Sequence, residues 1–105
     1  MNNIIEDEIR CKCTKRIAEI FRVDKGSLGD DTDLTKLCEA QSARFWKRNV
    51  ADKVLDDIRD AAGKESLKLL NSGEFEVRTF ADYVRFMQIC YEENPRLVQI
   101  VIGEV

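Results

Sequence analysis

The chain of 105 residues contains no histidine, and it has only one proline and five glycines. Without imidazole it lacks the usual acid–base group near neutral pH, the base that activates a catalytic serine or cysteine, and histidine ligands for zinc. The scarcity of proline and glycine excludes collagen-like, linker-like and loop-dominated architectures. No apolar run approaches the ~20 residues that a membrane-spanning helix requires. We therefore expect no membrane span and no histidine-dependent enzyme.

The first residues also lack the basic start and apolar core of a secretory signal peptide, so the expected location is the cytoplasm. The four cysteines fit a reducing compartment. Cys11 and Cys13 are two residues apart in a predicted helix, where their side chains point ~200° apart, and Cys38 and Cys90 lie far from them. We expect reduced thiols that hold no metal.

The composition is that of one globular, helix-rich domain. Hydrophobic residues make up 44% of the chain and charged residues 35%, against a charged fraction of about 25% in typical soluble domains. The net charge of −3 argues against a nucleic-acid partner, because such partners select basic surfaces. We expect a soluble monomer.

Apolar residues at intervals of three and four predict helices over residues 4–22, 42–60 and 64–70. Thr79, followed three residues later by Asp82, predicts the start of a last helix, which Asn94 and Pro95 end. The helical phases also predict which residues are buried together: Ile9, Ile17, Ile20, Trp46, Val50, Val54, Val84 and Met87.

Glycines and aspartates predict a long loop over residues 23–41, held in place by inserted apolar side chains, namely Val23, Leu28, Leu34 and Leu37. The β-branched segment 97–102 predicts an extended tail, either laid on the bundle or frayed. The predicted fold is therefore all-α: a four-helix bundle of three long helices and one short helix over residues 1–95. A long loop follows its first helix, and residues 96–105 form an extended C-terminal tail.

The carboxylates indicate neither catalysis nor a metal site. The aspartates at positions 30, 31 and 33 do not fit a calcium loop, because Lys36 occupies the position where such a loop requires glycine. Asp52, Asp56 and Asp60 share one side of a predicted helix at i, i+4 spacing, which is typical of a solvated stripe. We therefore expect a protein that is not an enzyme.

Ser42 stands at the predicted start of the second helix, directly after the long loop. The unpaired N–H groups and the positive end of a helix favour a phosphate at this position. Arg44, Lys47 and Arg48 follow and would lie near such a group. A serine that merely caps the helix is the simpler interpretation of this residue on its own.

Three segments together resemble acyl carrier proteins. Ile17–Val23 is similar to the end of that family's first helix, Asp31–Leu34 to its loop signature, and Val77–Val84 to the start of its last helix. Counted along the chain without a gap, Ser42 falls on the serine that carries 4′-phosphopantetheine in the family. The family's Gly-x-Asp-Ser-Leu motif corresponds here to Glu39–Ala43.

The resemblance implies that the four-helix bundle is acyl-carrier-like, with residues 1–95 as its domain. It also implies a carrier of acyl or aminoacyl groups in fatty-acid or lipid metabolism. Ser42 would bear a covalent 4′-phosphopantetheine arm, whose thiol holds the group as a thioester. The implied partners are a phosphopantetheinyl transferase and acyl-transferring or synthase-type enzymes. The alternative is a carrier-fold helical interaction domain that has lost the prosthetic group.

Two other serines imitate the attachment motif. Gly63–Leu67, which contains Ser66, matches Gly-x-Asp-Ser-Leu more closely than the Ser42 segment does, and Ser27 also lies between glycine and leucine. The local motif favours Ser66, whereas register favours Ser42. We select Ser42, because the arm must stand at a helix start flanked by the bundle.

Overall fold

Helices dominate the structure, a computed structural model that describes residues 3–37 and 50–104. They are α1 (Asn3–Phe21), α3 (Val50–Ala61), α4 (Lys64–Asn71), α5 (Phe80–Glu93) and α6 (Pro95–Ile102), with the 3-10 turn η1 (Lys25–Ser27) after α1. Within these residues there is no strand, and extended pairing is limited to one isolated bridge between Asp33 and Thr79. The described part of the chain is all-α, as its helical periodicity predicts.

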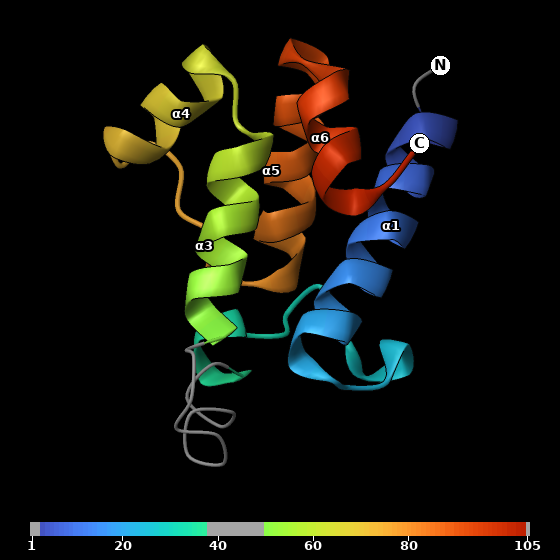
Figure 1. Ribbon diagram of the computed structural model, residues 1–105. Helices are drawn as coiled ribbons and strands as arrows, with labels where there is room; N and C mark the ends of the chain where they lie inside the picture. Colours follow the sequence, from blue (N-terminus) through green and yellow to red (C-terminus); the bar gives the residue numbers. More distant parts are fainter. Residues whose placement is uncertain (1–2, 38–49, 105) are drawn as a thin grey trace.

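The long helices lie side by side and α4 lies at one end of them. α6 packs on α3, α5 and α1, and α1 packs on both α5 and α3. Figure 1 shows α6 between α3 and α1, with α5 behind, and α4 at the upper end beside α3. No helix in the described part is both long enough and apolar enough to cross a membrane.

The centre of the bundle is filled by aromatic and aliphatic side chains from α1, α3, α5 and α6. The largest fully buried side chains include Tyr83, Phe21, Phe80 and Phe86. Six residues predicted to be buried are buried: Ile9, Ile17, Ile20, Val54, Val84 and Met87. Of the other two, Trp46 and the side chain of Val50 lie outside the described residues.

The loop after α1 is anchored to the start of α5. Leu34 is buried, and its N–H donates to the carbonyl oxygen of Arg78 at 2.8 Å, while the Phe80 N–H donates to the Thr32 oxygen at the same distance. The other predicted anchors, Val23, Leu28 and Leu37, are half-buried against the core. The prediction that apolar residues hold this loop is confirmed.

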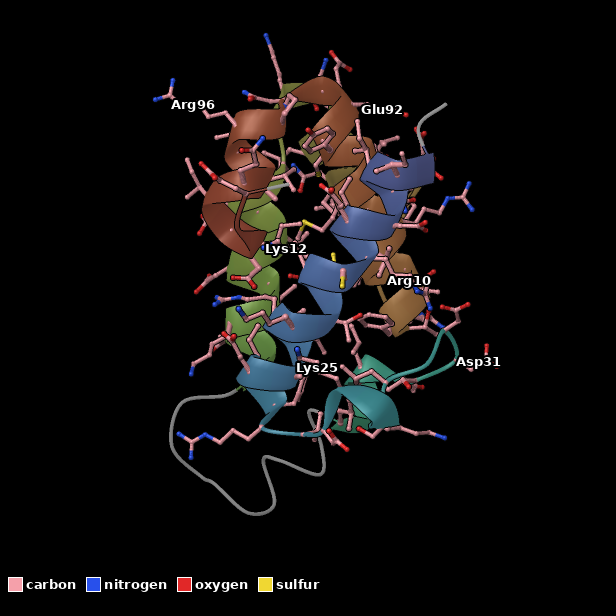
Figure 2. All side chains as sticks on the ribbon, turned by 90° about the vertical axis from the view of Figure 1, so that its right-hand side faces the viewer. Arg10, Lys12, Lys25, Asp31, Glu92 and Arg96 are labelled. Atoms are coloured by element: carbon pink, nitrogen blue, oxygen red, sulfur yellow. The ribbon has the colours of Figure 1, made fainter. Side chains whose placement is uncertain are left out.

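An ion pair and a cation–π contact from α1 also hold the loop that follows this helix. Arg10 pairs with Asp30, and its guanidinium carbon lies 5.7 Å from the centre of the Phe80 ring. Figure 2 views this side of the molecule, with Arg10 on α1 and Asp31 in the loop below it. The contacts hold the loop over the first turn of α5.

The loop ends earlier than predicted. Residues 34–37 are helical, whereas the glycines and aspartates predicted a loop as far as residue 41. The reason is local: Asp33 Oδ1 accepts the N–H of Thr35 at 2.9 Å and that of Lys36 at 3.2 Å, which satisfies two of the free donors of a new helix.

The start of α5 follows the prediction closely. Thr79 Oγ1 accepts the Asp82 N–H at 3.2 Å, and the Asp82 carboxylate accepts the Thr79 N–H at 3.1 Å, which completes a capping box. The helix ends at Glu93, immediately before Asn94 and Pro95, as expected.

The prediction of an extended C-terminal tail is wrong, because residues 95–102 form helix α6. Pro95 occupies the first turn, where its fixed φ suits a helix and its missing N–H costs nothing. Val98 and Ile102, four residues apart, are both buried. This burial outweighs the small preference of β-branched residues for extended backbone.

Candidate functional site

An apolar groove runs between α3, α4 and the connector that joins α4 to α5. We call it the α3–α4 groove; its volume is about 520 Å³. It is lined by Leu34, Thr35, Val54, Leu55, Ile58, Arg59, Leu67, Leu70, Asn71, Phe75, Glu76, Val77 and Arg78. Pockets of about 300–1,000 Å³ with mostly apolar walls and a few polar groups are the usual form of small-molecule sites.

Helix periodicity places the apolar side chains of α3 along one wall of this groove. Val54 and Ile58, four residues apart, are buried, whereas Leu55 keeps 47% of its surface exposed. Leu67 on α4, which is 36% exposed, is a second groove-lining leucine that remains open to solvent. The groove therefore offers apolar surface that the fold itself does not cover.

The connector from residue 74 to residue 79 supplies the next wall. Phe75 packs on the core through the Phe86 ring, with the two ring centres 5.5 Å apart. Val77 is half-buried beside it, and the main chain at Arg78 is held by the hydrogen bond from Leu34. Residues 74–79 contain no helix.

The α4 wall is fastened at its first turn by a carboxylate from α5. Glu93 accepts the N–H of Glu65 and the N–H of Ser66, each at 2.8 Å, and the Ser66 hydroxyl at 2.6 Å. The Ser66 hydroxyl, followed by the two backbone N–H groups, lowers the pKa of Glu93 below its usual range. The N-cap residue is Gly63, which has no side chain to offer, so Glu93 supplies the cap from another helix.

The contact with Glu93 determines whether Ser66 is accessible to a modifying enzyme. The residue is 1% exposed, and its hydroxyl is already engaged by Glu93. A modifying enzyme cannot reach such an oxygen without unfolding the first turn of α4. The close local match of Gly63–Leu67 to the carrier motif is therefore not supported by the position of the side chain.

The other two candidate serines differ. Ser27 is exposed in η1, and its hydroxyl donates to the Asp24 carbonyl oxygen at 2.6 Å. Ser42, the predicted attachment site, lies outside the described residues, as do Arg44, Lys47 and Arg48. The predicted helix over residues 42–60 coincides with α3 from Val50 onward.

On its other side, α3 carries a buried carboxylate that the sequence did not single out. Asp57 is 5% exposed; it accepts two hydrogen bonds from Arg16 of α1, at 2.7 and 2.9 Å, and one from the Tyr83 hydroxyl of α5 at 3.3 Å. The hydrogen bond to Asp57 raises the pKa of Arg16, and burial raises the pKa of Tyr83. The spacing of Asp57 from the apolar residues Val54 and Ala61 could have indicated its burial, since residues three and four apart share a face of a helix.

This trio ties α1, α3 and α5 together. All three groups are hydrogen-bonded, and no buried side-chain nitrogen or oxygen in the described part lacks a partner. The arrangement leaves no free base beside a nucleophile. We interpret it as a structural tie.

The thiols are poorly suited to nucleophilic chemistry. Cys13 and Cys90 are buried, and burial raises the pKa of Cys13 well above its usual range and that of Cys90 to about 11. Only the thiolate is strongly nucleophilic, so these groups are inert near neutral pH. Cys11 is exposed, Cys38 lies outside the described residues, and the described residues contain no cluster that could hold a metal.

Comparison of the chain with family models, with curated proteins and with solved structures found no match.

Proposed function

We propose that this protein is a divergent carrier of acyl or aminoacyl groups, with a 4′-phosphopantetheine arm on Ser42. Its work is to hold a thioester-linked group and present it to partner enzymes. The proposal joins the sequence resemblance to one structural observation, the α3–α4 groove of about 520 Å³.

The groove supports the proposal because a carried acyl chain needs apolar surface on which to lie. Exposed hydrocarbon on a short tether is unfavourable in water by about 25 cal/mol for each Å² of apolar surface. Leu55 and Leu67 leave such surface open along the groove. The groove thus supports a binding place for the carried acyl chain. The site of covalent attachment rests on the register of Ser42.

Elimination of the nearest competitor also supports Ser42. Ser66 is buried and bound to Glu93, and Ser27 follows α1 directly in a 3-10 turn of three residues. Neither is an exposed serine at the start of a long helix. Ser42 precedes α3, the helix that forms one wall of the groove.

The modification requires a transferase and coenzyme A. The Ser42 hydroxyl oxygen forms a new bond to the phosphorus that carries pantetheine, and the pyrophosphate bond of coenzyme A breaks. Adenosine 3′,5′-bisphosphate leaves, and the serine proton passes to a base of the transferase. Once bound, the arm supplies a thiol for thioester formation.

The second candidate is a carrier-fold interaction domain without an arm. It is favoured by the segment around Ser42, because Glu39–Ala43 lacks the aspartate and leucine that flank the family's serine. In this case α3 and the groove would serve protein contacts alone.

Intact mass spectrometry after co-expression with a broad-specificity phosphopantetheinyl transferase separates the two candidates. We expect a gain of one phosphopantetheine group that Ser42→Ala abolishes. Ser27→Ala is the matched control, since this exposed serine also lies in a Gly-Ser-Leu setting, and it should leave the gain intact. No gain with several transferases would favour the armless domain.

A further inference from the structure

Among the described residues that line the α3–α4 groove, one positive charge has no ion-pair partner. Arg59 lines it, is exposed, and makes no ion pair or side-chain hydrogen bond with any described residue. The other arginine on the groove, Arg78, is already paired, with its Nε 2.9 Å from Glu76 Oε2. An apolar lining and one free guanidinium therefore occur together.

The three acidic residues of α3 nearest to Arg59 in the sequence do not line the groove. Asp56, Asp57 and Asp60 line a different cleft, between α3 and α1, together with Lys53. Successive residues of a helix are ~100° apart, which directs Leu55 and Arg59 to the groove and these carboxylates to the opposite side. The part of α3 that lines the groove is thus apolar and basic.

We propose that the α3–α4 groove binds a free amphipathic carboxylate of the medium-chain fatty-acid class without any covalent bond. The hydrocarbon chain lies along Leu55 and Leu67, and the carboxylate pairs with Arg59. The proposal shares the groove with the carrier function but does not depend on Ser42 or on an arm.

The charge pattern selects this class of ligand. A guanidinium presents parallel N–H donors that match the two oxygens of a carboxylate. One free cation balances a monoanion, whereas a phosphate dianion would bring a second charge that the Arg78–Glu76 pair leaves uncompensated. An uncharged hydrocarbon ligand would leave the guanidinium of Arg59 without an anionic partner.

Titration calorimetry with the Ser42→Ala chain tests the proposal in the absence of any arm. The probes are decanoate, which has the carboxylate, and 1-decanol, which has the same chain length and no charge. Arg59→Gln is the test variant. Lys53→Gln is its matched control, because it removes the same charge from the same helix on the side of the other cleft.

We expect decanoate to bind, and Arg59→Gln to weaken this binding by up to about fivefold, the upper end of the range for a solvent-exposed charge pair. Binding of 1-decanol should not change in that variant, and Lys53→Gln should leave both ligands unaffected. Leu55→Glu, at an exposed position, should weaken both ligands because it alters the apolar wall.

Three results would overturn the proposal. They are no binding of decanoate, an equal loss with Arg59→Gln and Lys53→Gln, and binding that Leu55→Glu leaves unchanged. Because the chain tested cannot be modified at residue 42, none of these results bears on the mass gain that tests the carrier function.

Discussion

Glu93, the last residue of α5, caps the first turn of α4 by accepting both the N–H and the hydroxyl of Ser66, 27 residues earlier in the chain. Helix α4 has eight residues, which is too short for a helix to be stable in isolation. The contact with Glu93 therefore contributes directly to the position of α4, and hence to the wall of the groove that Leu67 and Leu70 form.

The first prediction concerns Gly63, which leaves room for this carboxylate. A Cβ at residue 63 would lie 2.5 Å from Cδ of Glu93 and within 2.8 Å of both its carboxylate oxygens. Gly63→Ala should displace Glu93 and speed amide hydrogen exchange in α4, while α5 stays protected. Gly26→Ala, at a glycine whose Cβ would meet nothing closer than 3.8 Å, is the control and should leave α4 unchanged.

The second prediction follows from the lowered pKa of Glu93. A carboxyl whose pKa is depressed on folding stabilises the fold above its unfolded pKa, and this contribution is lost as pH falls through the folded pKa. The amide NMR shifts of Glu65 and Ser66 should therefore titrate below about pH 4.3, the ordinary value for glutamate. Glu93→Gln should abolish the titration; a midpoint above the ordinary value would contradict the cap.

The third prediction concerns the buried carboxylate Asp57. Asp57→Ala removes the acceptor for Arg16 and Tyr83, and losing one partner of a fully buried pair costs about 3–5 kcal/mol. The side chain of Arg16 is 36% exposed, so water replaces part of the loss and we expect about 2–3 kcal/mol by urea unfolding. Asp60→Ala, at an exposed position on the same helix, should change stability by less than about 0.5 kcal/mol.

The fourth prediction tests whether α6 belongs to the core. Val98 is fully buried, whereas Ile100 in the same helix is 73% exposed. Val98→Ala should lower the free energy of unfolding by about 1–3 kcal/mol, and Ile100→Ala by much less, because little of its surface is removed from water. Equal effects of the two variants would show that residues 95–102 do not pack as α6 does here.

Local patterns were sufficient wherever the physical cause was local. The capping box of Thr79 and Asp82 spans three residues, and the helical phases that bury Ile17, Val54 and Met87 follow from 3.6-residue periodicity alone. The half-buried anchors of the loop were also recognisable, because isolated apolar residues among aspartates and glycines have few other roles.

The candidate site could be predicted only in part. The sequence directed attention to Ser42 through register, and to Ser66 through a local motif. The motif was misleading for Ser66, since its environment depends on Glu93, a residue of another helix. The groove itself combines residues from position 34 to position 78, so no local sequence pattern predicts it.

The sequence by itself determined the class of the fold, the phases of its helices and the absence of histidine-based chemistry. Only the tertiary structure decided that residues 95–102 are helical and that Asp57 is buried. It also decided that Arg59 lies beside an apolar groove with no ion-pair partner among the described residues. The reason is that local periodicity and capping involve neighbours within one or two turns. Burial and charge pairing depend on which distant side chains the packed helices bring together, and that energy outweighs the small intrinsic preferences of a segment.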